Sequence, residues 1–376
     1  MQELSFIIDI KKSGDSCKYF EGTKKYIATA DIIDDEIVSY TEVTYTNKPS
    51  RANVIAKPGD VIFAKMQNTI KVIVVDEETS NYIYSTGFYC IQDDRYLPEF
   101  LKCYFMSKAF NEKKDKNCNG ATMKALSDEG FKKIKLPLIT KEVQKQIIDE
   151  YLAISSSIKN KNKQIAIFDE LIKSQFIEMF ENKGYASCQI IEVSEFVKDG
   201  THQTPTYTED KINGFKFLSS KDVMSKKIDW SNIKYIPADL HNQLYSTIKP
   251  RRNDILMSKN GVNYGVAALN DTDEIFDIYV SLALIRPKNI INPRYFQTVL
   301  NMECTKEQFD KSIKGIGVPN LHLSEIKKTM ILLPPVELQD QFAAIVEQID
   351  KSKYILQKQI DALQELLDSK MEEFFG

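Results

Sequence analysis

The sequence predicts a duplicated fold, in which two mixed α/β (α+β) globular domains are separated by a long, antiparallel two-helix coiled coil with pseudo-two-fold symmetry. Three observations predict it. Residues 138–180 contain neither proline nor glycine and carry apolar residues at helical spacing. Residues 333–375 have the same character, with proline only at their start. The two segments, together with the chain just before each of them, align with each other at a constant shift of 195 residues.

This alignment passes through positions that two unrelated helices would not share. The aligned pairs include Pro98 and Pro293, Gly120 and Gly315, Gln144 and Gln339, and Phe180 and Phe375. Two helices of merely similar composition would not keep register through a loop glycine and a proline. We therefore infer an internal duplication. It divides the chain into a first globular domain (1–137), a central long helix (138–182), a second globular domain (186–333) and a C-terminal long helix (334–376).

Both globular domains show the signals of a mixed α/β fold. In the first, residues 60–66, 70–75 and 82–92 are rich in β-branched and aromatic residues and predict strands. Pro98 then opens a predicted helix over 99–115, and Ser127 is placed to cap a short one. The second domain repeats this order with strands at 254–259 and 275–286, a helix over 294–313, a glycine loop at 315–320 and a cap at Ser324.

The long segments carry their apolar residues in steps of four and three, which is typical of a coiled-coil seam. Each would form a rod on the order of 60 Å long, and each needs a partner to bury its stripe. The predicted seam comprises Ile147, Ile154, Ile158, Ile165, Phe168 and Ile172 in the first rod and Phe342, Ile349, Leu356, Ile360, Leu363 and Leu367 in the second. Lysines interrupt it where Lys161 aligns with Leu356 and Lys353 with Ile158. Such lysines either fix the register or extend out of the seam.

The composition favours an intracellular protein without a metal centre. Six scattered cysteines form no Cys-x-x-Cys pair, and three histidines are few for a metal site. No apolar run is long enough to span a membrane, so we expect a cytoplasmic location. The net charge of −3 arises in the last helix, where residues 334–376 carry 4 basic and 9 acidic side chains. The globular domains are thus neutral or slightly basic, which neither requires nor excludes DNA binding.

Three motifs occur in a fixed order. The second rod opens with Leu-Pro-Pro-x-x-x-Gln-x-x-Phe at 333–342. Lys-Pro-Arg-Arg-Asn-Asp-Ile-Leu-Met-Ser-Lys-Asn-Gly at 249–261 has a counterpart at 57–65, and Asp-Gly-Thr-His-Gln-Thr-Pro stands at 199–205. In this order, and over essentially the whole chain, the sequence resembles the specificity subunits of Type I restriction–modification systems. It departs from the family pattern in the first domain, which has no Gly-Thr-x-x-Thr-Pro motif.

The resemblance implies a subunit that performs no chemistry itself. Each globular domain would be a target recognition domain that reads one half of a bipartite, asymmetric site on double-stranded DNA. The rods would set the distance between the readers and dock two methyltransferase subunits, which bring S-adenosylmethionine and methylate adenine N6. Restriction subunits, where present, would add ATP and Mg²⁺, and the chain itself would bind no cofactor or metal. The half-sites would lie about one helical turn apart on DNA.

DNA readers use lysine and arginine for phosphates, and amide and hydroxyl side chains for base edges. In the first domain the candidates in predicted loops and strand ends are Lys24, Lys25, Arg51, Lys65, Gln67, Asn68, Lys71, Asn119 and Lys124. In the second they are Thr201, His202, Gln203, Thr204, Tyr207, Lys221, Arg251, Arg252, Lys259, Asn260, Asn263, Tyr264 and Asn320. Lys65 and Lys259 are singled out because both follow the duplicated strand.

Enzymatic motifs are absent from the sequence. It contains no Asp/Asn-Pro-Pro-Tyr/Phe motif of adenine methyltransferases and no Gly-x-x-x-x-Gly-Lys-Ser/Thr phosphate loop. Carboxylate-x-Lys triplets such as those at 112–114 and 325–327, which a nuclease could use, are expected by chance at 27% charge and leave an autonomous nuclease a distant third interpretation. Two nearer alternatives to a Type I DNA-recognition subunit stay open at this point. One is a coiled-coil scaffold whose globular domains bind proteins, and the other is the specificity subunit of a fused Type II restriction–methylation enzyme.

Overall fold

The computed structural model describes residues 5–7, 12–121, 123–313 and 319–376, so the predicted glycine loop at 315–320 lies mostly outside it. The chain forms two compact units. Unit 1 comprises residues 1–163 and 356–376, and unit 2 comprises residues 164–355. Each unit therefore combines one globular domain with part of both long helices, and each is described separately below.

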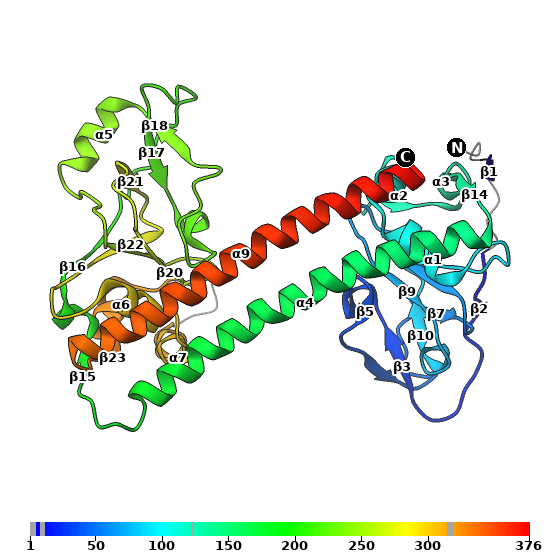
Figure 1. Cartoon of the computed structure of the whole chain (residues 1–376), viewed down its shortest axis with the longest axis horizontal. Helices are drawn as coiled ribbons and strands as arrows, with labels where there is room; N and C mark the ends of the chain where they lie inside the picture. The colour runs from blue at the N-terminus through cyan, green and yellow to red at the C-terminus, as the bar shows by residue number, and fades with distance from the viewer. Residues whose placement is uncertain (1–4, 8–11, 122, 314–318) are drawn as a thin grey trace. The chain divides into compact units, whose positions relative to one another are not determined.

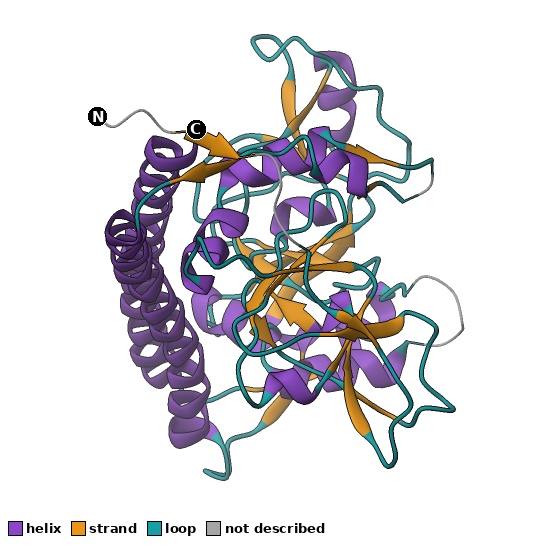
Figure 2. Ribbon diagram, turned by 90° about the vertical axis from the view of Figure 1, so that its right-hand side faces the viewer, coloured by secondary structure: helices purple, strands orange, loops and turns teal. Residues whose placement is uncertain are grey.

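The predicted rods are two helices of 40 residues, α4 (Lys141–Phe180) and α9 (Val336–Phe375). Within each unit their segments lie side by side (Figures 1 and 2). In unit 1, Lys370 pairs with Glu150 at 3.3 Å and the Lys161 ammonium donates to Gln359 at 2.7 Å. Rising numbers in one helix meet falling numbers in the other, so the packing is antiparallel and the predicted fold class is confirmed.

The lysines that interrupt the seam find polar partners on the facing helix. Lys161 reaches Gln359 in unit 1, and in unit 2 Lys353 pairs with Asp169 at 2.6 Å. The predicted seam residues that are buried are Ile147, Phe342, Ile349, Ile360 and Leu367, and those that are half-buried are Ile154, Ile158, Ile165, Phe168, Ile172, Leu356 and Leu363.

Unit 1 contains a five-stranded sheet in the order β2-β7-β10-β3-β6 and a three-stranded sheet in the order β11-β8-β9. The strands of the larger sheet are β2 (Asp15–Ser16), β3 (Lys24–Ile27), β6 (Thr41–Val43), β7 (Ala52–Ile55) and β10 (Ile83–Ser85), and those of the smaller are β8 (Val61–Ala64), β9 (Val72–Val74) and β11 (Phe88–Ile91). Strand pairs are formed by β4 (Ile32–Ile33) with β5 (Glu36–Ile37), β12 (Cys118–Asn119) with β13 (Ala125–Leu126), and β1 (Ser5–Ile7) with β14 (Leu136–Leu138). The helices are α1 (Pro98–Met106), α2 (Lys108–Lys116) and α3 (Asp128–Phe131).

Unit 2 contains a four-stranded sheet in the order β16-β22-β19-β20 and a three-stranded sheet in the order β18-β17-β21. The strands are β16 (Ser194–Asp199), β17 (Phe215–Leu218), β18 (Lys234–Ile236), β19 (Ile255–Ser258), β20 (Ala267–Leu269), β21 (Phe276–Ile278) and β22 (Leu282–Pro287), with β15 (Ser187–Gln189) paired to β23 (Met330–Leu332). The helices are α5 (Ala238–Tyr245), α6 (Pro293–Leu300), α7 (Glu303–Ser312) and α8 (Leu323–Lys328).

The fold is repeated even in the front halves of the domains, where the sequences no longer align. Strand β3 pairs antiparallel with β6 and parallel with β10, and β17 pairs in the same way with β18 and β21. A 3-10 turn follows both β3 and β17. In unit 1 the Asp31 carboxylate accepts a bond from the Ala28 amide at 2.7 Å, and in unit 2 Asp222 accepts one from Ser219 at the same distance.

Several predicted elements differ in detail. Residues 82–92 form two strands in different sheets, β10 and β11, and the helix predicted after Pro98 is two helices, α1 and α2. The second begins because Ser107 is extended and its hydroxyl accepts a bond from the Phe110 amide, which makes it a new N-cap. The helix predicted after Pro293 is likewise divided into α6 and α7. The cap at Ser127 is confirmed, whereas that at Ser324 is wrong, because His322 occupies the N-cap position of α8.

A buried glutamine joins each long helix to its globular domain. In unit 1 the Gln144 side chain accepts from the Leu97 amide at 2.8 Å and donates to the carbonyls of Arg95 and Ile139. In unit 2 Gln339 makes the same three bonds, with Asn292, Ile290 and Pro334, each 195 residues later. A buried amide with all of these partners fixes the angle between helix and domain.

The ends of the long helices complete the two cores. Phe375, the last residue of α9, lies in the core of unit 1 with ring centroids 5.1 Å from Tyr104 and 5.6 Å from Phe100. Phe180, the last residue of α4, lies in the core of unit 2 at 5.3 Å from Tyr295. The two phenylalanines are equivalent under the duplication, so each domain is closed by the far end of the helix that follows the other domain.

Candidate nucleic-acid interface

The duplicated lysines occupy the same place in both units, directly after the central strands β8 and β19. In unit 1, the Leu126 amide donates to the Lys65 carbonyl at 2.8 Å, and Met66 forms a bridge with Ala125. In unit 2, the Leu321 amide donates to the Lys259 carbonyl at 2.8 Å. Each strand end is thereby joined to the segment that precedes a short helix.

This pairing brings several of the predicted DNA-binding residues together. In unit 1 the Gln67 amide donates to the Lys124 carbonyl at 3.0 Å, which places these two candidates beside Lys65. In unit 2 the Asn260 side chain donates to Asn320 at 3.2 Å, beside Lys259. Asn260 and Asn320, which are far apart in the sequence, thus form one amide pair at the surface.

The ammonium of Lys65 lies in a cationic cluster. It donates to the Thr86 carbonyl at 2.9 Å and lies 4.3 Å from the ring centroid of Tyr89, over which Lys12 also lies at 4.4 Å. Burial and the charge of Lys12 lower the pKa of Lys65, while Asp128 opposes this shift. Asp128 forms an ion pair with Lys12 and accepts from the Tyr89 hydroxyl, so one carboxylate partly offsets the two ammonium groups at this strand end.

The corresponding lysine of unit 2 is neutralised. Lys259 is only 6% exposed and forms an ion pair with Asp199, which also lies 3.5 Å from the Nε2 atom of His202. The Asp-Gly-Thr-His-Gln-Thr-Pro motif is therefore attached to the duplicated strand by its first residue. Sequence reasoning missed Asp199, although its place at the head of the motif was a usable signal.

Equivalent aspartates hold the segments that follow the two lysines. In unit 1 the Asp115 carboxylate accepts from the Asn68 amide at 3.1 Å, and in unit 2 the Asp310 carboxylate accepts from the Tyr264 hydroxyl at 2.5 Å. Bonds from Lys306 and Tyr264 hold the pKa of Asp310 below its ordinary value. These aspartates were also missed as site residues, although they align under the duplication.

Other candidates lie elsewhere in their units. Arg251 and Arg252 precede β19 and so lie at the opposite end of that strand from Lys259, and Arg252 pairs with Asp273 at 2.7 Å. In unit 1, Lys24 and Lys25 belong to the other sheet, where Lys25 donates to the Tyr82 hydroxyl at 3.0 Å.

The remaining candidates differ in whether they form hydrogen bonds within the protein or are exposed at its surface. Lys71 donates to the Thr29 carbonyl at 2.6 Å, and the Thr201 amide donates to the Ile278 carbonyl at 3.0 Å. The candidates that are exposed at the surface are Arg51, Asn68, Asn119, Lys124, His202, Gln203, Thr204, Tyr207, Lys221, Arg251, Arg252, Asn260, Asn263 and Asn320.

In the described parts of the chain, no three histidine, cysteine, aspartate or glutamate side chains could hold a metal ion. No helix among the described residues is long and apolar enough to cross a membrane.

The family model for the Type I restriction modification DNA specificity domain matches the chain twice, at residues 7–167 and 184–365. The chain belongs to this family. The two matches coincide with the two copies of the duplication, so each is one specificity domain.

Relatives and solved structures agree with this assignment. The chain is 23% identical to the MjaVIII specificity subunit of a Type I restriction enzyme from Methanocaldococcus jannaschii, over 95% of this chain and 89% of the relative. It is also 23% identical to the EcoBI specificity subunit of Escherichia coli over 41% of this chain and 32% of the relative. The fold matches the Type I S subunit from M. genitalium with a TM-score of 0.54 at 15% identity, over 100% of this chain and 97% of that one. A structure from a study of Type I complex assembly matches with a TM-score of 0.57 at 19% identity, over 97% and 95%.

The first specificity domain is additionally fixed to α4 by charge. Asp35, in the turn between β4 and β5, pairs with Lys102 of α1 at 2.8 Å and with Lys159 of α4 at 2.8 Å. Glu36 adds a second contact to Lys159 at 2.9 Å. Burial alone would raise the pKa of Asp35, but the two lysines hold it below its ordinary value.

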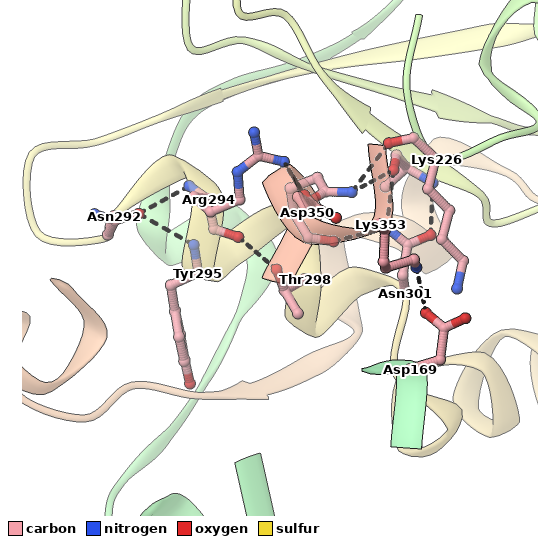
Figure 3. A network of polar contacts seen from close by, with 11 residues as sticks. Asp169, Lys226, Asn292, Arg294, Tyr295, Thr298, Asn301, Asp350 and Lys353 are labelled. Atoms are coloured by element: carbon pink, nitrogen blue, oxygen red, sulfur yellow. Dashed lines mark hydrogen bonds and ion pairs between the residues drawn. The ribbon is translucent and has the colours of Figure 1, made fainter. Parts of the chain in front are cut away.

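The second specificity domain is attached to its long helix through different residues. Gln297, which aligns with Lys102, donates to the main-chain carbonyl of Lys226 at 3.3 Å, and Asn292 caps α6 (Figure 3). Arg294 of α6 instead reaches Asp350 of α9 at 3.6 Å. The ion pair to the long helix is therefore formed by the turn in the first domain and by α6 in the second.

We expect Asp35→Asn to lower the free energy of unfolding of unit 1 by about 1–2 kcal/mol at neutral pH, because two charge-assisted bonds are lost at a site where Lys159 remains half exposed. Since the pKa of Asp35 is depressed in the folded state, its contribution is present above the ordinary carboxyl pKa and is lost as the pH falls through the folded value. The difference between variant and wild type should therefore shrink below about pH 4.

Hydrogen exchange of unit 1 amides at several pH values measures this difference. Asp34→Asn is the matched control, because Asp34 is the exposed neighbour in the same turn with a positive φ of 51° that asparagine also adopts. Equal effects of the two substitutions, or a difference independent of pH, would contradict the assigned role of Asp35.

Proposed function

We propose that the chain is a non-catalytic DNA sequence-recognition subunit of a restriction–modification complex. Each specificity domain reads one half of a bipartite, asymmetric site on double-stranded DNA. The proposal rests on the repeated site at Lys65 and Lys259, where the main-chain pairing is the same in both units but the surrounding side chains differ. Two recognition domains that share a main-chain framework but differ in their surface side chains are suited to bind two different half-sites.

The outer faces of the long helices supply a surface for partner subunits. Exposed apolar side chains on α4 are Leu152, Ile167, Leu171 and Ile177, and those on α9 are Val336, Tyr354, Ile355 and Leu366. Leu171 and Leu366 are equivalent under the duplication, so each copy exposes one leucine at this position, whereas the positions equivalent to Leu152 and Ile177 carry Glu347 and Glu372. We propose that two methyltransferase subunits dock there, one for each copy.

The chemistry of the complex would then reside on its partners. The methyltransferase subunits supply S-adenosylmethionine and methylate adenine N6, and restriction subunits, where present, supply ATP and Mg²⁺. The chain itself binds no cofactor and acts in the cytoplasm, where the chromosome is accessible. A fused Type II enzyme would use the same two readers, and the neighbouring genes distinguish the two systems.

We expect the chain, assembled with its methyltransferase subunits, to protect two separated blocks of a duplex that carries its methylated site. Lys124→Glu should weaken binding about tenfold and remove one block, because it puts a carboxylate on the exposed segment that is hydrogen-bonded to the residues after Lys65. Asn260→Asp should do the same to the other block, because it inserts an anion into the amide pair with Asn320. Footprinting and gel shift at fixed salt concentration measure both effects.

Lys183→Glu is the matched charge control, since Lys183 is exposed in the turn that follows α4. It should leave both blocks intact. A single protected block, or none with the wild-type complex, would contradict the proposal and favour a protein-binding scaffold.

A further inference from the structure

The loops that follow the duplicated lysines carry a further inference. We call them the tip loops: residues 66–71 join β8 to β9 in unit 1, and residues 260–266 join β19 to β20 in unit 2. In unit 2 the Ser258 hydroxyl donates to the Asn263 carbonyl at 2.7 Å and accepts from the Val266 amide at 3.0 Å. The Gly261 amide donates to the Pro319 carbonyl at 3.1 Å. The loop is therefore held in one conformation by its own strand and by the neighbouring segment.

The equivalent aspartates anchor both tip loops to the helices behind them. Asp310 holds Tyr264 in unit 2, and Asp115 holds the Asn68 amide in unit 1. In unit 1 the buried ammonium of Lys114 adds a bond to the Thr69 carbonyl. An anchor repeated at the same position, on loops of different sequence, indicates that the loops must be rigid for a shared purpose.

Each rigid tip loop exposes a branched aliphatic side chain beside amides. Val262 is 83% exposed and stands between Asn260 and Asn263, and Ile70 is 41% exposed two residues after Asn68. A single exposed aliphatic residue is ordinary on a protein surface. Here, however, it occurs in both copies, on anchored loops, beside the site at which charged and amide side chains gather.

The combination of an aliphatic and an amide side chain matches one base pair. In the major groove an A·T pair presents the thymine 5-methyl group next to the adenine N6 donor and N7 acceptor. Asparagine bonds the adenine edge in both directions, and an aliphatic group contacts the methyl group. Neither contact requires a charged side chain. This agrees with unit 2, where Asp199 neutralises Lys259, the residue just before the tip loop.

We infer that the tip loops read A·T base pairs, with Val262 in unit 2 and Ile70 in unit 1 contacting a thymine 5-methyl group while the neighbouring asparagines contact adenine. This inference rests on the proposed function, because it assigns specificity-determining residues to the two readers. The anchors through Asp310 and Asp115 pre-organise the loops, so that little conformational entropy is lost on binding.

The test replaces each thymine of the site in turn by deoxyuridine, which lacks only the 5-methyl group. The site is first determined by methylome sequencing, and affinity is then measured for the chain with its methyltransferase subunits. One replacement in the half-site read by unit 2 should weaken wild-type binding about fourfold, the factor expected for one buried methyl group. In Val262→Ser and Val262→Gly, which present no methyl group at this position, that replacement should have little further effect.

Ile290→Ala is the control, because Ile290 is exposed in the turn after the far end of β22. It should keep the wild-type response to deoxyuridine at every position. The inference is overturned if no thymine of the half-site read by unit 2 responds to deoxyuridine in the wild type, or if Val262 variants respond as the wild type does. A wild-type complex that binds no specific site would overturn the proposed function instead, so the two failures are distinguishable.

Discussion

Phe375→Ala should lower the free energy of unfolding of unit 1 by about 3–5 kcal/mol, the cost of removing a large buried aromatic side chain. Phe375 is 1% exposed and contacts the rings of Phe100 and Tyr104 in the core of the first specificity domain. Its equivalent, Phe180→Ala, should cost unit 2 a similar amount, because Phe180 contacts Tyr295 and Phe342 there.

The two units can be followed separately. The chain has one tryptophan, Trp230, which lies in unit 2 with its ring 5.6 Å from Phe276. Its fluorescence reports the unfolding of unit 2, and hydrogen exchange of amides in residues 12–121 reports that of unit 1. Leu366→Ala, at an exposed position of the same helix as Phe375, should cost at most about 0.5 kcal/mol. Loss of unit 2 stability in Phe375→Ala with unit 1 unchanged would refute the assignment of the C-terminus to the first domain.

Inserting the same heptad into both long helices should change the DNA site. If it follows Lys163 in α4 and precedes Leu356 in α9, the seam is continued on both sides. Seven residues lengthen a helix by about 10 Å, which corresponds to about three base pairs. We expect the preferred spacing of the half-sites to grow by that amount, and the affinity for the original site to fall at least about a hundredfold, toward non-specific binding.

Binding to a series of duplexes with different spacers measures this shift. The control places the same heptad in the turn at 182–184, where Asn182 and Gly184 have positive φ values of 57° and 77°. An insertion there leaves both helices unchanged and should leave the spacing unchanged. An unaltered spacing after the insertion into the helices would refute their role as a ruler.

The long helices and the duplication could be predicted because the sequence shows them as regular, repeated patterns. An apolar step of three and four over forty residues allows only a long helix, and the aligned Gln144 and Gln339 mark where each begins. The break at Ser107 could not be predicted, because a serine within an amphipathic pattern is compatible with a continuous helix until its hydroxyl is seen to cap the next one. The sheets in the front halves of the two domains could not be predicted to be copies of each other. Their short strands pair in the same way but differ in their side chains, so their sequences do not align.

The site was predicted by residue type, and its organisation was not. Lysines and asparagines near strand ends could be named as candidates, but Asp115, Asp199 and Asp310 were overlooked since carboxylates repel phosphate. Their role is indirect: they hold a lysine or a loop in place, and this depends on partners that are distant in the sequence. Conversely, Arg251 and Arg252 have side chains suited to bind phosphate, but they lie at the end of β19 opposite Lys259.

The closure of the first domain by the last helix has a consequence for synthesis on the ribosome. Residues 164–355 form one contiguous unit, whereas the core of the other unit is complete only when residues 356–376 have joined residues 1–163. At about 5–20 residues per second, the intervening chain of roughly 200 residues takes on the order of 10–40 seconds to translate. During that time the apolar surface that will receive Met371 and Phe375 stays uncovered. A product truncated before α9 ends keeps this surface exposed and is a substrate for chaperones and proteases, so a first reader is finished only in chains that include residues 356–376.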